Sequence, residues 1–171
     1  MERHVIKGRV LRCGDNIDTD VIIPARYLVY TDPAILASHV MEGIDPDFSK
    51  KVKSGMNIII AGRNFGCGSS REHAVIALKH AGVQAIIATS FARIFFRNAI
   101  NQGLPLVECN VPEEIESGEV VEIHLKKGEI IFPEKGSKFK FKPLPDFLLR
   151  IIEGGGLINF LRERLRTSGI R

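Results

Sequence analysis

Residues 57–74 read NIIIAGRNFGCGSSREHA, an apolar run that leads through a glycine-rich loop into a helical pattern. Glycines at positions 62, 66 and 68 can adopt backbone dihedral angles that other residues avoid, so the loop can turn tightly and approach a ligand closely. After the loop, small apolar residues recur at helical spacing from Ala74 to Ala81, and Gly82 is typical of a helix end. The stretch therefore predicts a strand, a ligand-binding loop and a helix, as found in α/β folds.

The start of the predicted helix carries two hydroxyls and a guanidinium group, from Ser69, Ser70 and Arg71. The unpaired N–H groups and the positive dipole end of a helix favour a carboxylate or a phosphate at this position. A structural role is the alternative, because Ser69 and Glu72 have the spacing of a capping box. The sequence lacks both the lysine of a P-loop and the third glycine of a dinucleotide fingerprint. A small organic acid is therefore the expected ligand.

The alternation of strands and helices continues to residue 108, and the C-terminal third of the chain has a different pattern. Short buried strands are expected at 84–89 and 104–108, on either side of a helix at 90–100 with Ser90 as its candidate N-cap. Strands and helices that alternate in this way predict a parallel layer. The C-terminal third instead predicts antiparallel hairpins. The remaining expectations are a strand at 5–11, hairpin strands at 120–125, 129–132 and 138–142, helices at 33–41 and 145–153, a polar connection at 45–55, and an amphipathic helix at 157–165.

Composition narrows the class of protein. The 171 residues carry a formal charge of +4, with 44% hydrophobic and 26% charged residues, which is typical of one globular domain spanning 1–171. Basic and aromatic residues do not alternate as on a nucleic-acid surface, and no run approaches the ~18 apolar residues of a membrane span. We therefore expect a cytoplasmic protein that binds neither nucleic acid nor membrane. Cys13, Cys67 and Cys109 form no C-x-x-C pair, so no metal or cofactor is expected in this chain alone.

Three motifs together indicate a family. Residues 18–28 (DTDVIIPARYL), 66–73 (GCGSSREH) and 90–94 (SFARI) resemble the small subunit of 3-isopropylmalate dehydratase, which corresponds to the swivelling domain of aconitase. The resemblance covers essentially the whole chain. It implies an α/β fold of the swivelling β/β/α type, with a mixed, barrel-like sheet and flanking helices.

The same resemblance implies a hydro-lyase made of two different chains. A large subunit would carry a four-iron, four-sulfur cluster with one open iron, and the small subunit would close over it and complete the active site. The reaction would interconvert 2-isopropylmalate and 3-isopropylmalate by dehydration and rehydration, in leucine biosynthesis.

The resemblance also assigns roles to individual residues. Ser69 matches the catalytic base, and Arg71 matches the arginine that binds a substrate carboxylate and stabilises the serine alkoxide. Ser70 and Gly68 match substrate-binding positions. The roles of Cys67 and Arg93 stay open at this point.

A second loop, residues 26–30, matches the substrate-recognition loop of the family, with the substrate-binding residues Arg26, Tyr27, Leu28, Val29 and Tyr30. Its apolar members suit an isopropyl group, whereas a homoaconitase would need an arginine to bind a further carboxylate. An apolar pocket discriminates single methyl groups by only ~1–3 kcal/mol. Two alternatives therefore stay open: a related hydro-lyase subunit acting on homoaconitate, citraconate, methylmalate or dimethylmalate, and a stand-alone dicarboxylate-binding regulatory domain.

Overall fold

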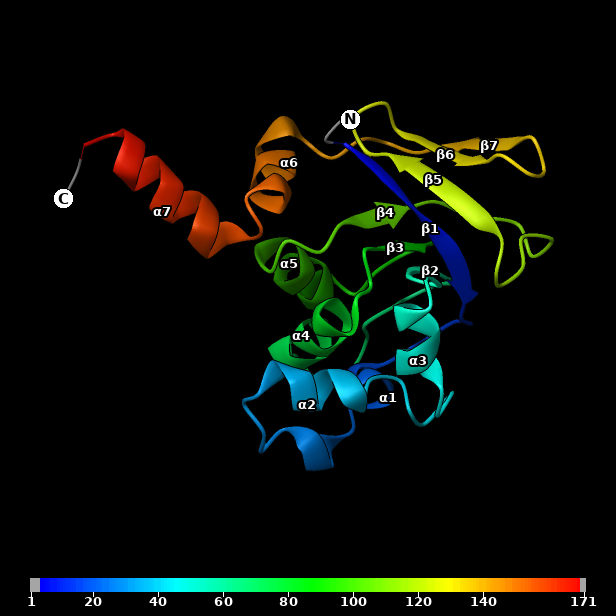
Figure 1. The fold of residues 1–171 in the computed structure, drawn as a ribbon, viewed down its shortest axis with the longest axis horizontal. Coiled ribbons are helices and arrows are strands. Elements are labelled where there is room, and N and C mark those ends of the chain that lie inside the picture. The colour runs from blue at the N-terminus through cyan, green and yellow to red at the C-terminus, as the bar shows by residue number, and fades with distance from the viewer. Residues whose placement is uncertain (1–3, 170–171) are drawn as a thin grey trace.

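A computed structural model describes residues 4–169 of the chain. Within this range the protein has one seven-stranded sheet, with helices on its faces and a last helix that extends away from the body (Figure 1). The strands are β1 (Val5–Arg12), β2 (Ile58–Ala61), β3 (Ala85–Ala88), β4 (Leu106–Glu108), β5 (Val120–His124), β6 (Glu129–Phe132) and β7 (Ser137–Lys140). The helices are α1 (Thr19–Ile22), the 3₁₀ helix η1 (Ala25–Tyr27), α2 (Pro33–Ser38), α3 (Phe48–Lys53), α4 (Glu72–Ala81), α5 (Arg93–Asn101), α6 (Asp146–Glu153) and α7 (Leu157–Thr167).

The sheet has a parallel half and an antiparallel half that meet at β1. Its strand order is β4-β3-β2-β1-β5-β6-β7, with β1 to β4 parallel and β1, β5, β6 and β7 paired antiparallel. Strands β2 and β3 are buried along their whole length, as expected for parallel strands covered on both faces. In β5 and β6 buried and half-buried residues alternate, the pattern of strands with one inward face. Both predicted patterns are confirmed.

Two apolar cores lie on the two faces of the parallel half. One core packs α1 to α5 against the sheet and includes Phe65, Leu78 and Phe95. The other contains Ile60 from β2 together with Ile130 from β6 and residues of β5 and α6. The antiparallel half therefore curls over the second face of the parallel half, giving a half-barrel. It is not closed, because β4 and β7 remain the edges of the sheet. The prediction of a mixed, barrel-like sheet with flanking helices is confirmed.

Two predicted helix starts are wrong. Helix α4 begins at Glu72 with Arg71 in the N-cap position, so Ser69 and Glu72 form no capping box. Glu72 instead accepts a hydrogen bond from the side-chain amide of Gln102. Helix α5 has Ala92 at its N-cap, and Ser90 accepts a hydrogen bond from the backbone N–H of Asn64 at 2.8 Å. In both places tertiary contacts hold the loop in a conformation that differs from the one favoured by local spacing.

The other predicted helices lie close to their expected positions, but three short helices, α1, η1 and α3, were not predicted. Gly82 ends α4 in the left-handed region at φ +108°, as predicted. The segment 45–55 was expected to be a polar connection, but it contains α3, which buries Phe48 and Val52 one turn apart. Helix α7 is amphipathic as predicted, yet its apolar residues Ile158, Leu161 and Leu165 are exposed. No helix within residues 4–169 is long and apolar enough to cross a bilayer.

Candidate active site

The glycine-rich loop lies between two other loops at the carboxyl ends of adjacent strands. On one side, Gly66 donates its N–H to the carbonyl of Ile17 at 2.7 Å, and Thr19 donates its N–H to Cys67 at 2.9 Å. Ile17 lies in the loop that follows β1, and Thr19 is the first residue of α1. Neighbouring parallel strands thus bring the two motifs together, in the region where open α/β sheets bind ligands.

The other side of the glycine-rich loop is fixed to the segment that follows β3. Phe65 donates its N–H to the carbonyl of Ser90 at 3.0 Å, and Ala92 donates its N–H to the carbonyl of Phe65 at 2.9 Å. The loop is therefore held by backbone hydrogen bonds on both flanks. Such a loop presents its side chains with little freedom before a ligand arrives.

The need for glycine is clearest at position 66. Gly66 has φ +81°, in the left-handed region that side chains disfavour. A Cβ atom there would lie 2.1 Å from Cγ of Phe95, which is buried beneath the loop. Any larger residue would therefore displace either the loop or the aromatic ring that supports it.

A hollow of about 300 Å³ opens beside this loop. Its polar lining consists of Thr19, Ser69, Ser70, Arg71, Arg93 and Asn98, and Gly68 also borders it. Both serines are exposed to the hollow, immediately before the start of α4. The structure thus brings together the four glycine-loop residues that the sequence predicts for the site, at positions 68 to 71.

Thr19 is a part of the hollow that the sequence analysis did not single out. Its side chain is buried, and its Oγ1 donates a hydrogen bond to the carbonyl oxygen of Ser69 at 2.8 Å. The contact fixes the backbone of the first serine. The sequence did point to Thr19 as a candidate site residue, because Thr19 lies inside the 18–28 motif. Asn98 was also missed, although it follows Ile94 by one helical turn on α5 and borders the same hollow.

Arg71 is oriented by an ion pair with the loop after β1. Its Nη1 lies 3.0 Å from Oδ1 of Asp20, and it also reaches the carbonyl of Ile23 at 3.5 Å. The hydrogen bond from Arg71 is the main cause that holds the pKa of Asp20 below its usual value, and the backbone N–H of Ala25 adds to it. The guanidinium carries five N–H donors, so donors remain for an anion in the hollow.

The charges of the site suit an acidic ligand. Arg71 and Arg93 contribute two guanidinium groups to the lining, and no carboxylate borders the hollow within residues 4–169. The adjacent start of α4 adds unpaired N–H groups and the positive end of a ten-residue helix. Together they can bind a dianion such as a dicarboxylic acid.

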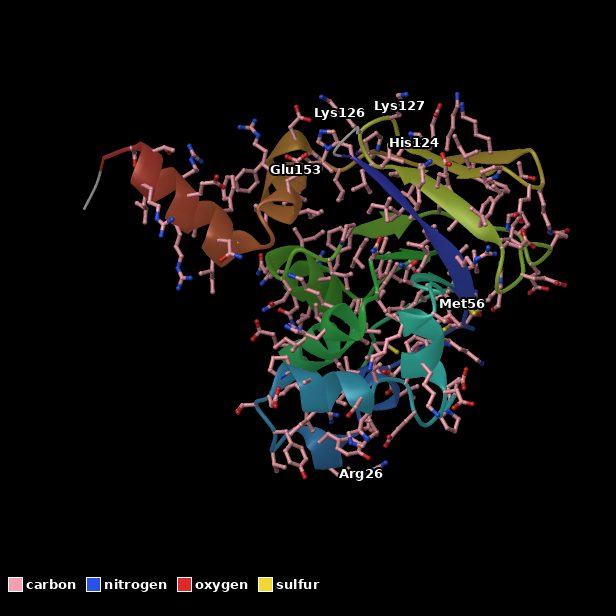
Figure 2. All side chains as sticks on the ribbon, in the orientation of Figure 1. Arg26, Met56, His124, Lys126, Lys127 and Glu153 are labelled. Carbon is pink, nitrogen blue, oxygen red and sulfur yellow. The ribbon has the colours of Figure 1, made fainter. Side chains whose placement is uncertain are left out.

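The predicted recognition loop lies outside this hollow. None of residues 26–30 belongs to its lining, which is drawn from residues 4–169. Arg26 and Tyr27 instead contact Glu42, and Figure 2 shows Arg26 at the end of the molecule opposite the antiparallel strands. Val29 and Tyr30 are exposed. The loop is tied to the site only indirectly, because Asp20 accepts hydrogen bonds both from Arg71 and from the N–H of Ala25.

Metal ligands do not cluster in the part of the chain that the structure describes. Within residues 4–169, no three His, Cys, Asp or Glu side chains are arranged to hold a metal ion. Burial raises the pKa of the Cys13 thiol to about 11, with the charge of Asp45 as a second cause. Cys67 is half-buried within the glycine-rich loop.

Comparison with known proteins agrees with this geometry. Residues 16–110 match the family model of the aconitase C-terminal domain, a range that contains all three loops of the site. The chain therefore belongs to the aconitase C-terminal domain family, and within it to the 3-isopropylmalate dehydratase small subunits, as full-length similarity to proteins with that name shows.

Three of these similarities extend over nearly the full length of both chains. The "3-isopropylmalate dehydratase small subunit" of Halothermothrix orenii is 58% identical over 95% of this chain and 99% of its own length. The "Isopropylmalate/citramalate isomerase small subunit" of Methanocaldococcus jannaschii is 54% identical over 97% and 99%. A crystal structure of 3-isopropylmalate dehydratase from the latter organism superposes with a TM-score of 0.90 at 52% identity, covering 96% of this chain and 98% of the other.

Proposed function

We propose that the chain is the small subunit of a heteromeric, cytoplasmic hydro-lyase that interconverts 2-isopropylmalate and 3-isopropylmalate in leucine biosynthesis. The observation that carries the proposal is the rigid placement of two exposed serines and Arg71 at the start of α4, beside a hollow lined by guanidinium groups. The family membership of the chain supports the same reaction. The whole of residues 1–171 acts as one swivelling domain in this proposal.

Ser69 is the catalytic base in this proposal. It removes a proton from the carbon next to a substrate carboxylate, the C–O bond on the neighbouring carbon breaks, and an alkene remains. The proton and the departing hydroxide together make up the water that is lost. Water then adds across the double bond in the opposite sense, which moves the hydroxyl to the adjacent carbon. A serine can act as a base only where its ionised form is stabilised, and a nearby cation and helix N–H donors supply that stabilisation.

Arg71 and Ser70 hold the substrate while the proton moves. The guanidinium of Arg71 pairs with a substrate carboxylate and stabilises the Ser69 alkoxide, while Asp20 keeps it oriented. The hydroxyl of Ser70 and the backbone at Gly68 offer further hydrogen bonds. Thr19 maintains the geometry, because its hydrogen bond to the Ser69 carbonyl limits movement of the base.

The iron–sulfur cluster belongs to a large subunit in our proposal. The donor groups of residues 4–169 do not fit such a cluster, because no three of their His, Cys, Asp or Glu side chains are grouped so that they could hold a metal ion. When bound, a cluster of this kind supplies a Lewis acid that assists departure of the hydroxyl. The small chain contributes the base, the carboxylate-binding groups and closure of the site against water.

Citramalate, the 2-methyl analogue of isopropylmalate, is the second candidate substrate. The Methanocaldococcus jannaschii relative is named for both compounds. We assign the choice between alkyl groups to Leu28, Val29 and Tyr30 of the recognition loop. Leu28 and Val29 are apolar, and the side chains of Val29 and Tyr30 are exposed. At ~1–3 kcal/mol for each methyl group, two methyl groups correspond to ~2–6 kcal/mol, so the two activities can differ by roughly 30-fold to a few times 10⁴-fold.

The test is assembly and assay. The chain is co-expressed with the large subunit of its own source under anaerobic conditions, and the purified complex is assayed with isopropylmalate and citramalate. We expect an active complex and an inactive isolated small chain. Absence of activity with either acid, in a complex whose cluster is verified by absorbance, would refute the proposed function.

A further inference from the structure

Glu42 is the centre of a hydrogen-bond cluster beneath the recognition loop. Its Oε1 accepts from Nη2 of Arg26 at 2.6 Å and from the hydroxyl of Tyr27 at 2.6 Å. Its Oε2 lies 2.7 Å from Nδ1 of His39. Only 24% of the Glu42 side chain is exposed. Three short contacts on one partly buried carboxylate make an organised cluster rather than a loose surface ion pair.

The ring of Tyr27 is held from two sides as well as at its hydroxyl. The imidazole of His39 stacks on it with ring centroids 3.9 Å apart and planes 11° apart. The guanidinium of Arg26 lies 4.7 Å from the ring centroid. Arg26 thus has its charge paired with Glu42 and one face covered by an aromatic ring. Its guanidinium is thereby oriented toward Glu42 and the Tyr27 ring, while 65% of the Arg26 side chain remains exposed.

The backbone next to Glu42 is in an uncommon conformation. Met41 has φ +56°, and a bulky side chain in the left-handed region costs roughly 1–2 kcal/mol. The residue is fully buried, and its N–H donates to the carbonyl of Ile22 at the end of α1 at 2.8 Å. Strain of this kind persists only where surrounding contacts impose it, and it is frequent at functional sites. Here it turns the chain so that Glu42 reaches the loop.

The tip of the loop, at Leu28, Val29 and Tyr30, lies outside this cluster. Leu28 packs partly against the core, whereas Val29 is 79% and Tyr30 43% exposed. Partial burial by itself would raise the pKa of Glu42, but the hydrogen bonds from Tyr27 and His39 outweigh it and lower the pKa. The carboxylate therefore stays charged at neutral pH and holds the base of the loop.

We propose that Glu42 is a positioning residue for substrate selection, which acts by holding Arg26 and Tyr27 so that only the apolar tip of the loop meets the substrate. This inference rests on the proposed function. Its consequence is a preference for di-acids with an alkyl group over tri-acids, because Glu42 competes with a substrate carboxylate for the guanidinium of Arg26. A third substrate carboxylate would have to share the Arg26 guanidinium with the carboxylate of Glu42, whose like charge opposes it.

Glu42→Gln tests the inference in the assembled enzyme. The amide keeps the size of the side chain but removes the charge that pairs with Arg26. We expect KM for isopropylmalate to rise about 5–20-fold while kcat stays within about twofold, because a loop that must order on binding weakens substrate affinity. The ratio of kcat/KM for isopropylmalate over homoaconitate, a tri-acid, should fall by a similar factor.

A coupled variant separates positioning from a general loss of stability. Tyr27→Phe removes one hydrogen bond to Glu42 and keeps the ring stacked on His39. If Glu42 acts through Tyr27, the effect of Glu42→Gln on KM should be smaller in the Tyr27→Phe background than in the wild type. The matched control is Glu129→Gln, because Glu129 is 22% exposed and pairs with Lys138 at 2.7 Å on the opposite half of the sheet. Its kinetics should equal those of the wild type.

Hydrogen exchange on the full-length small chain alone gives a readout that is independent of activity. Faster exchange of the backbone amides at 25–31 in Glu42→Gln, with α4 unchanged, is the expected result. Unchanged exchange, or an unchanged KM and substrate ratio in an active complex, would overturn the role of Glu42. If the wild-type complex has no activity with isopropylmalate, the proposed function fails, while the exchange measurement still decides whether Glu42 holds the loop.

Discussion

The two halves of the sheet differ in how they use their loops. In the parallel half, the loops after β1, β2 and β3 all lie at the carboxyl ends of the strands. They form the hollow with its serines and arginines. In the antiparallel half, turns such as the one between β6 and β7 connect surface strands with exposed ion pairs, for example Lys138 with Glu129. Parallel strands all have their carboxyl ends on the same side of the sheet, so the loops that follow them can form one site. In antiparallel hairpins the turns alternate between the two ends of the strands. The comparison implies that chemistry resides in one half, and that the other half covers its core.

The largest expected contrast between the halves is in turnover. Ser69→Ala should lower kcat of the assembled enzyme roughly 10²–10⁴-fold, the range for loss of a positioned base. The exposed hydroxyl contributes no packing, so the unfolding free energy should stay within about 0.5 kcal/mol of wild type. The measurements are steady-state kinetics on the complex and urea unfolding of the small chain.

Ser137→Ala is the matched control for that variant, because Ser137 begins β7 in the antiparallel half. It should have the kinetics of the wild type. Full turnover by the Ser69→Ala complex would remove Ser69 from its role as base and would weaken the division between the halves.

The next contrast is in stability, and it compares alanine substitutions at two glycines with positive φ, one in each half of the sheet. Gly66→Ala places a Cβ 2.1 Å from the ring of Phe95, whereas Gly136→Ala, in the turn before β7, meets nothing within 4 Å. Gly136→Ala should therefore cost only the left-handed penalty of about 1–2 kcal/mol. Gly66→Ala should cost about 1–3 kcal/mol more, through overpacking. The two variants are compared by urea unfolding. Equal losses of unfolding free energy would show that the loop can shift to accommodate the Cβ atom above Phe95.

Asp20→Asn should give a smaller effect that depends on pH. Without the ion pair Arg71 is less well oriented, so KM for isopropylmalate should rise several-fold, with a lesser change in kcat. The folded pKa of Asp20 is lowered, so the stability from the pair is present above the ordinary carboxyl value of 3.8 and is lost as the pH falls through the lowered value. The difference in unfolding free energy between wild type and Asp20→Asn should thus be constant near neutral pH and shrink below pH 3.8. A difference that grows on acidification would contradict the pairing with Arg71.

The sequence predicted those parts of the molecule that local pattern controls. Helix α4 and its end at Gly82 follow from apolar spacing and a glycine, and the short runs of isoleucine and alanine mark the buried strands. The capping box failed because the chain around Ser69 is held by Thr19, fifty positions earlier. Such a contact outweighs a local preference worth about 1 kcal/mol.

Two other features, helix α3 and the position of the loop at 26–30, could not be predicted from the sequence for related reasons. Helix α3 has only Phe48 and Val52 on its buried face, too few apolar positions to define a period in a polar segment. The loop at 26–30 could be matched to a recognition loop by its motif, but its position outside the hollow could not be predicted. Its Tyr27 contacts Glu42, which follows the left-handed Met41, and no sequence pattern indicates that conformation.

The smallest expected effect lies in the antiparallel half. Lys138→Ala breaks the pair with Glu129, in which the lysine is 48% exposed, so solvent and salt screen the attraction. The loss of unfolding free energy should be below about 1 kcal/mol and should vanish at high salt. Kinetics of the complex should not change. A rise in KM or weaker assembly in Lys138→Ala would mean that the β6–β7 hairpin contacts the large subunit. The antiparallel half would then take part in building the enzyme as well as covering its core.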